Sequence, residues 1–208
     1  MPANAISVYS LPKIAPGDST WVIDSAETIS RATESTLNNK LAKLAETTGL
    51  ELRMVAIHRQ GYDDPIEVFA TKLFNNWFPD PETAANQTIV AIDTVSNNSA
   101  ILTGTEGQKM LSEEKIDSII TETIGTDLKL GNKYNQAFLD ASDRISAILA
   151  GQSDPGPRIA ESTINTEGTF TKAEDTDTGN ATLWVIGLLI VATIVPMATY
   201  FFYVGFSN

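Results

Sequence analysis

An uncharged apolar run near the end of the chain constrains this protein more than any other feature. Residues 181–206 read ATLWVIGLLIVATIVPMATYFFYVGF and contain no Asp, Glu, Lys or Arg. A helix crosses the hydrocarbon core of a bilayer with about 20 apolar residues, so this run is long enough to span it with some tilt. The alternative is a buried core helix, but uncharged runs of this length are rare in soluble domains. The sequence therefore predicts one transmembrane helix over residues 181–206.

The segment before this run, residues 151–180, is polar and rich in turn-forming residues. It reads GQSDPGPRIAESTINTEGTFTKAEDTDTGN, and Phe170 is its only aromatic residue. Such a composition buries too little apolar area to offset the entropy that is lost on ordering. We expect a flexible acidic linker, with a root-mean-square reach of about 30 Å for a chain of this length.

Acidic residues outnumber basic ones in this chain, and cysteine is absent. The sequence holds 26 Asp and Glu against 14 Lys and Arg, for a formal net charge of -12. Binding to nucleic acid depends on clustered Lys and Arg, so this balance argues against a nucleic acid partner. It also argues against docking on an anionic membrane surface. Without cysteine, disulfides, thiolate metal sites and cysteine nucleophiles are excluded.

The two ends of the chain bear on which side of the membrane the rest of the protein occupies. Ala3-Asn4-Ala5 fits the small-x-small pattern that precedes signal peptidase cleavage, although a chance alanine-rich start fits it equally. Lys and Arg mark the cytoplasmic side of membrane helices, and none follows the apolar run, whereas an acidic stretch precedes it. We expect a mature or nearly mature exported chain, with its globular part in a lumen or a periplasm.

Hydrophobic periodicity predicts an α/β domain over residues 18–150, here called the head, after an extended N-terminal segment over residues 1–17. Leucines at helical spacing predict a helix over residues 30–48. The run LELRMVAIH, residues 50–58, is typical of a strand that is buried on both faces. A second helix, residues 64–77, carries an apolar stripe and starts at an Asp-Pro pair suited to the N-cap and first-turn positions.

The second half of the head continues with a hairpin and two helices. TIVAIDTV and SAILTG are strand-like on either side of the turn SNN, so they predict a hairpin. Helices follow over residues 112–124 and 133–150, each with an apolar stripe. Strand–helix–strand units imply parallel pairing, to which the hairpin adds an antiparallel strand. The predicted fold class is therefore α/β, a three-layer sandwich with a small mixed β-sheet between helices, plus the transmembrane helix.

Six stretches of the head, in order along the chain, are VIDSAETIS, TTGLELRMVAI, IEVFATKLFNNW, IVAIDTVSNNSAILTG, LSEEKIDSII and YNQAFLDASDRI. Together they resemble the TPM domain, a module of thylakoid-lumen phosphatase-like proteins involved in photosystem II maintenance. They cover about residues 18–150, and their order along the chain is specific. A single membrane helix after an acidic linker is similar to the branch of the family that acts in photosystem II repair.

Candidate site residues come from the carboxyl ends of the predicted parallel strands, where open α/β sheets bind ligands. Asp24 and Asp93 end the first and third strands, and carboxylate oxygens are the ligands that Ca²⁺ and Mg²⁺ prefer. His58, Arg59 and Asp63 follow the strand between them and are candidates for a binding cleft. Structural alternatives stay open for several of them: Asp24 as a helix cap, Asp63 in a turn and His58 as a hydrogen-bonded strand end.

A phosphatase, which the resemblance suggests, fits known phosphatase chemistry poorly. A histidine nucleophile would have to be His58, in IHRQG, where the usual Arg-His-Gly order is absent. An aspartate nucleophile would be Asp93, but DTVSN lacks the second Asp that acts as general acid–base. A two-metal site needs several ligands around two ions, and the chain has a single His. The enzyme hypothesis therefore ranks second.

The tether, the charge and the resemblance together predict a membrane-anchored accessory protein of photosystem II. Its lumenal domain would act in assembly, repair or protection, with photosystem II subunits or an assembly intermediate as partners. The alternative is a metal-dependent acid phosphatase of the thylakoid lumen or periplasm. We expect a single-pass protein of a thylakoid membrane, as in cyanobacteria, with the head in the lumen. The alternative location is a bacterial plasma membrane, with the head in the periplasm.

Overall fold

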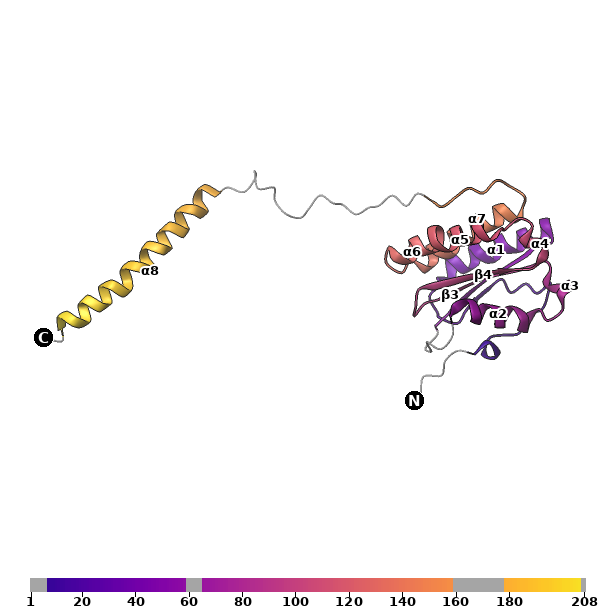
Figure 1. Ribbon diagram of the computed structural model, residues 1–208, viewed down its shortest axis with the longest axis horizontal. Helices are drawn as coiled ribbons and strands as arrows, with labels where there is room; N and C mark the ends of the chain where they lie inside the picture. The colour runs from indigo at the N-terminus through magenta and orange to yellow at the C-terminus, as the bar shows by residue number, and fades with distance from the viewer. Residues whose placement is uncertain (1–6, 59–64, 159–177, 207–208) are drawn as a thin grey trace. The chain divides into compact units, whose positions relative to one another are not determined.

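The computed structural model describes residues 7–58, 65–158 and 178–206 (Figure 1). The chain separates into two compact units, Met1–Ala160 and Glu161–Asn208, and each is described by itself. Most of the predicted linker lies outside the described residues, so its flexibility stays a prediction.

The first unit is built on a four-stranded sheet in the order β1-β2-β3-β4. β1 (Val22–Asp24), β2 (Glu51–Ile57) and β3 (Gln87–Asp93) run parallel, whereas β4 (Asn98–Thr103) runs antiparallel to β3. Every residue of the two central strands except Glu51 is buried, as their nearly continuous apolar sequences require. The predicted mixed sheet is confirmed.

Helices cover both faces of this sheet, which confirms the predicted three-layer sandwich (Figure 1). One face packs against α1 (Arg31–Thr48), α7 (Tyr134–Leu149) and a helical stretch over residues 113–129. The other face packs against α2 (Ile66–Trp77) and the short helix η1 (Val8–Ser10). Two further short helices are α3 (Pro81–Ala84) and α4 (Thr105–Gln108).

Helix α2 shows the predicted apolar stripe most clearly. Its buried residues are Ile66, Phe69, Ala70, Leu73, Phe74 and Trp77. The helix starts at Ile66, so Pro65 takes the N-cap position and not the predicted first-turn position. The predicted N-cap, Asp64, lies outside the described residues.

The described part of the N-terminal segment, residues 7–17, packs into the core beside α2. Val8, Leu11 and Ile14 are all buried there. The indole Nε1–H of Trp77 donates to the carbonyl of Pro12 at 3.0 Å, which fixes the segment against the helix. This segment therefore adds apolar surface to a core that α2 alone leaves open on one side.

Arg53, in β2, is a fully buried cation that joins this N-terminal segment to the sheet. Its guanidinium pairs with Glu51 Oε2 at 2.6 Å and donates to the side chain of Gln87. It also donates to the carbonyls of Ala15 and Asp18 at 3.3 and 3.2 Å. These partners offset much of the cost of removing a charge from water, which is large for an unpaired cation.

The helix that was predicted to end at residue 124 continues to Lys129, and its middle is π-helical. Its three parts are α5 (Glu113–Ser118), η2 (Ile119–Ile124) and α6 (Gly125–Lys129). A π-helical turn brings residue 125 close to the carbonyl of Ile120, where an added Cβ would lie 3.0 Å away. Glycine at position 125 therefore suits this widened turn.

Arg144, on α7, fixes the π-helical turn from the side. Its guanidinium donates to Thr123 Oγ1 at 3.0 Å and to Ser118 Oγ at 2.9 Å. It also pairs with both carboxylate oxygens of Asp154, at 2.8 and 2.9 Å, and this pairing lowers the pKa of Asp154. Arg144 is only 5% exposed, so these bonds are shielded from water.

Asp127, on α6, is a buried carboxylate close to another one. It is 3% exposed, and its Oδ2 atom has no hydrogen-bond partner among the described residues. Burial and the negative charge of Asp140 raise the pKa of Asp127 to about 6. The Arg158 guanidinium opposes this shift from 3.6 Å, while its Nε lies 2.8 Å from Asp140 Oδ2. Ionised Asp127 therefore lowers the stability of the folded state at neutral pH.

The second unit contains α8 (Thr178–Phe206), a helix of 29 residues that confirms the predicted apolar C-terminal helix. Within its residues Thr182–Phe206, an 18-residue window has a mean hydropathy of 2.2, and none of that window is buried. In the described part of the chain it is the one helix long and apolar enough to cross a membrane, by length and composition.

Asp127→Asn is expected to stabilise the head at pH 7.5 by on the order of 2 kcal/mol, because it removes a buried charge. The ordinary pKa is 3.8 and the folded-state pKa is about 6. The wild type therefore regains this stability as the pH falls from about 6 to below 4, and the advantage of the variant disappears there. Urea unfolding of the full chain in detergent at these pH values measures the difference.

Glu46→Gln is the matched control, since Glu46 is exposed on α1 and its loss changes the net charge equally. An equal gain in both variants at pH 7.5 would mean that net charge, and not burial of Asp127, sets the effect.

Candidate functional site

The carboxyl ends of β1, β2 and β3 meet at one edge of the sheet, as their parallel order requires. Asp24 lies opposite Ala56, and Asp93 lies opposite Ile57, so both carboxylates are within one residue of the same level. The strand β2 separates them, which places their backbones roughly 10 Å apart. Strand alternation also assigns the two residues to opposite faces of the sheet. They are thus brought to one edge but not to one point.

Asp24 organises the loop between β1 and α1. Its Oδ1 accepts from the backbone N–H of Ala26 at 3.2 Å, and its Oδ2 accepts from that of Ile29 at 2.6 Å. The helix cap itself is Ser30, whose hydroxyl accepts from the N–H of Thr33. Asp24 is therefore a loop residue, and the alternative that it caps α1 directly is wrong.

Asp93 holds the turn between β3 and β4. It is 2% exposed, and its two oxygens accept from the N–H of Val95 at 3.1 Å and the hydroxyl of Ser96 at 2.8 Å. The hydroxyl of Tyr134, on α7, donates to the carbonyl of Thr94 at 3.1 Å and so attaches α7 to this turn. Burial and the charge of Asp93 raise the pKa of Tyr134.

His58 lies directly after β2 and is exposed. Its Nδ1 is 3.1 Å from the hydroxyl of Thr94, and the N–H of Thr94 donates to the carbonyl of Ile57 at 2.9 Å. This is the hydrogen-bonded strand end that was one alternative for His58. Arg59 and Asp63 lie outside the described residues, so the predicted cleft stays a prediction.

Local hydrogen bonds thus engage both oxygens of Asp24 and of Asp93. Among the residues that the structure describes, no three His, Cys, Asp or Glu side chains are grouped so as to hold a metal ion. A Ca²⁺ or Mg²⁺ site at this edge stays a hypothesis that needs further ligands. What the described geometry supports directly is stabilisation of two turns.

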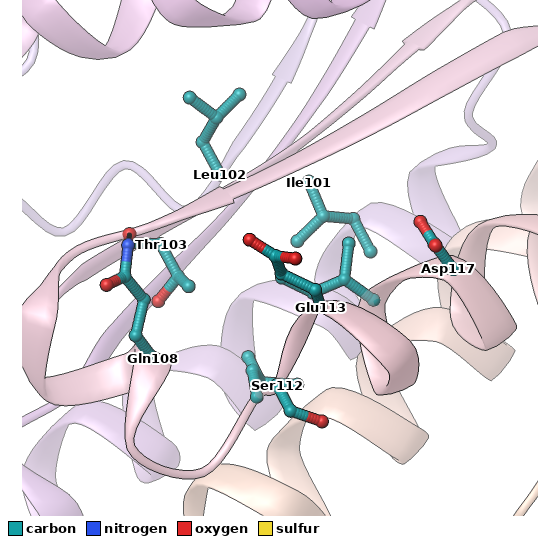
Figure 2. Close-up of a pocket in the computed structure, with 9 residues that line it drawn as sticks. Ile101, Leu102, Thr103, Gln108, Ser112, Glu113 and Asp117 are labelled. Carbon is teal, nitrogen blue, oxygen red and sulfur yellow. Dashed lines mark hydrogen bonds between the residues drawn. The ribbon is translucent and has the colours of Figure 1, made fainter.

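A second site, which the sequence did not indicate, is a cavity of about 470 Å³ between β4 and the α4–α5 region (Figure 2). Its volume lies within the range of small-ligand pockets. The lining residues are Ile101, Leu102 and Thr103 from β4, and Gln108, Leu111, Ser112, Glu113, Ile116 and Asp117 from the region that follows. Ile101 and Leu111, which are both buried, form an apolar wall of the cavity.

Polar groups stand at the rim of this cavity. Gln108 Nε2 donates to the backbone carbonyl of Thr103 at 3.1 Å, which attaches α4 to the end of β4. Figure 2 shows the Glu113 carboxylate directed toward β4, and Asp117 one turn further along α5. Glu113 and Asp117 are both exposed. The cavity therefore combines an apolar wall with an acidic rim.

Gly107 allows α4 to approach the sheet closely enough to bound this cavity. A Cβ added there would lie 1.9 Å from Thr103 Oγ1 and 3.2 Å from Thr88 Oγ1. These two threonine hydroxyls are hydrogen-bonded to each other at 2.8 Å and are buried, so neither has room to withdraw. Only glycine fits at this position without displacing the strand.

The fold and these sites define a small α/β domain that is joined to an apolar helix. The family model of the TPM domain matches residues 22–148, which is more than half of the chain. This protein therefore belongs to the TPM domain family, as its motifs indicated.

The chain is 31% identical over 202 residues to a chloroplastic UPF0603 protein of Arabidopsis thaliana, in an alignment that covers 96% of this chain and 70% of that protein. It is 28% identical over 193 residues to a chloroplastic UPF0603 protein of Oryza sativa subsp. japonica, over 91% of this chain and 64% of that protein. The chain thus spans less than two thirds of the rice protein.

The solved N-terminal domain of a P. gingivalis protein has the same fold. It matches with a TM-score of 0.65 and 22% identity, over 72% of this chain and 94% of that domain. At this identity the likeness shows the fold alone.

Asp93→Ala is expected to lower the free energy of unfolding by about 1–3 kcal/mol, because the N–H of Val95 and the hydroxyl of Ser96 lose their acceptor. The loss should be the same in chelator and in millimolar Ca²⁺ or Mg²⁺. Thermal unfolding of the full chain in detergent measures it, with Asp93→Asn as the control that keeps one acceptor. Ion-dependent stabilisation of the wild type that is absent in Asp93→Ala would instead support the metal site.

Proposed function

We propose that this protein is a membrane-anchored accessory protein that keeps a TPM domain beside photosystem II or one of its assembly intermediates. The observation that carries the proposal is the presence, on one chain, of a TPM domain and of an apolar helix with a candidate span of 25 residues, whose large apolar side chains are exposed. An uncovered apolar surface of this size is expected in lipid, where the backbone groups of a helix are satisfied internally.

The chloroplastic relatives support the same organisation and the same compartment. The alignment with the Arabidopsis protein covers 96% of this chain, so it takes in most of the C-terminal apolar helix as well as the head. In this proposal the anchor keeps the head within reach of membrane-bound complexes, and the head acts in the assembly, repair or protection of photosystem II.

The sidedness that we propose is a head in the thylakoid lumen. Its support is the acidic stretch before α8, since Lys and Arg mark the cytoplasmic flank of a membrane helix, together with the Ala3-Asn4-Ala5 pattern. A bacterial plasma membrane with the head in the periplasm is the same arrangement in a different membrane. The acidic composition, with a net charge of -12, favours protein partners over nucleic acid in either case.

Leu189→Arg combined with Val191→Arg is expected to move the protein from the membrane pellet to the soluble fraction. Each arginine near the middle of a membrane helix costs about 2.5–3.5 kcal/mol of insertion. Leu189→Ala with Val191→Ala is the matched control and should remain in the pellet. Retention of the double arginine variant in the pellet after a carbonate wash would mean that α8 does not anchor the chain.

Affinity purification of the tagged full chain from solubilised thylakoids tests the partner. Photosystem II subunits should be recovered with the wild type and lost with the double arginine variant. Recovery of other membrane complexes in place of photosystem II would contradict this part of the proposal.

A metal-dependent acid phosphatase is the second candidate, and the exposed His58 at a parallel strand end is the observation that keeps it open. We expect the full chain to hydrolyse p-nitrophenyl phosphate at the same low rate as His58→Asn and Asp93→Asn, because the described residues present no grouped metal ligands. Activity that both substitutions abolish, while circular dichroism shows intact folding, would establish the enzyme instead.

A further inference from the structure

The outer edge of β4 is a strand edge that the described part of the head leaves unpaired, since β4 pairs there only with β3. The N–H of Gly104 donates to the carbonyl of Gln87 at 2.8 Å, which sets the phase of the antiparallel ladder. Backbone groups alternate between the two sides of such a strand. Those of Ala100 and Leu102 therefore face β3, and those of Ser99 and Ile101 face outward.

The contact between Gln108 and Thr103 agrees with this phase. Thr103 occupies the same alternate positions of β4 as Ser99 and Ile101, so its backbone groups also face away from β3. Its carbonyl accepts from Gln108 Nε2 at 3.1 Å and not from β3. Gln108 thus occupies the last outward carbonyl of the edge. The outward groups of Ser99 and Ile101 present the pattern that a further strand would pair with.

The cavity with the acidic rim lies along the same edge. Ile101 lines it and belongs to the core on the α1–α7 side of the sheet. Successive side chains of a strand point to opposite faces, so a strand added beside β4 would direct every second side chain toward this cavity. The apolar wall of Ile101, Leu111 and Ile116 suits an aliphatic side chain there.

The carboxylates at the rim of the cavity indicate which charged side chain such a strand would carry. Glu113 and Asp117 are exposed at the rim, and within the described residues neither carboxylate has an ion-pair or hydrogen-bond partner. A Lys or Arg placed two residues from the aliphatic side chain would lie on the same face and reach these carboxylates.

We infer that the free edge of β4 binds an extended segment of a partner protein, with an aliphatic side chain in the adjoining cavity and a basic side chain at Glu113 and Asp117. This inference rests on the proposed accessory function, because it names how the head holds its partner. Main-chain pairing with Ser99 and Ile101 provides affinity, and the cavity with its acidic rim provides selectivity.

The charges of this chain disfavour the two other occupants of the edge. Residues 159–177 contain five carboxylates and one lysine, so this segment would be repelled by the acidic rim. A second copy paired edge to edge would bring its own Glu113 and Asp117 close to those of the first. A basic segment of another protein is therefore the occupant that fits.

A synthetic peptide tests the inference on the full chain in detergent micelles. The probe is fluorescein-labelled Thr-Leu-Thr-Lys-Thr-Leu-Thr-Lys-amide, which alternates threonine with leucine or lysine, and fluorescence anisotropy measures its binding. Glu113→Gln with Asp117→Asn should weaken binding at least tenfold. Glu46→Gln with Glu67→Gln removes two exposed carboxylates elsewhere and should leave it within twofold.

Main-chain pairing is tested on the peptide and on the protein. Peptides that are N-methylated at alternate residues, in two complementary sets, keep the charge but lose donors, and at least one set should bind tenfold more weakly. Ser99→Pro removes the outward N–H of Ser99 and should have the same effect, whereas Ser99→Ala should bind normally. Thermal unfolding shows whether the Ser99→Pro variant is folded. The methylated peptides test main-chain pairing with the wild-type protein, so they do not depend on that variant.

Four outcomes would overturn the inference. Equal weakening by the two carboxylate double variants, or undiminished binding of both methylated peptides, would mean unspecific attraction to an acidic protein. Sedimentation that shows a dimer dissociated by Ser99→Pro would assign the edge to a second copy. Failure of the peptide to bind, while photosystem II subunits are still recovered with the wild type, would reject the β4 site and leave the accessory function standing. Binding of the peptide without recovery of photosystem II subunits would reject the accessory function and leave the β4 site standing.

Discussion

Burial of β2 and β3 on both faces is the constraint on which the rest of the structure depends. Because water reaches neither face of these strands, the sheet needs a helical layer on each side. The N-terminal segment completes one layer, and Arg53 attaches it to the sheet through partners that replace water. The antiparallel β4 then ends the sheet on one side, and among the described residues no further strand pairs with its outer edge.

The sequence predicted those parts of the fold that local periodicity encodes. The α2 stripe from Ile66 to Trp77, the extent of α1 to within one residue and the hairpin all depend on residues close together in the chain. The π-helical turn was missed because Arg144, about twenty residues further on, fixes it through Thr123. The role of Arg53 was missed for the same reason, since its carbonyl partners precede β1.

The candidate sites divide in the same way. Parallel order was enough to bring Asp24, His58 and Asp93 to one edge of the sheet. It was not enough to say what their side chains do, because the bonds of Asp24 to Ala26 and Ile29 depend on loop conformation. The cavity beside β4 had no sequence signal, since a strand, a glycine at position 107 and a helix of ordinary composition become a site only when packed together.

The proposed function combines an anchor with a recognition edge: in it, α8 would hold the head at the membrane, and the edge of β4 would select the partner. Restriction of this kind would raise the effective concentration of a membrane-bound partner, so the paired segment would need less affinity of its own. Site-specific photo-crosslinking in thylakoid membranes of a photosynthetic host tests this claim most directly. A benzoylphenylalanine in place of Glu114, the exposed neighbour of Glu113 on α5, should give a light-dependent product that contains a photosystem II subunit, and one in place of Glu46 should give none. Products of equal yield from both positions, or none from position 114, would contradict the proposal.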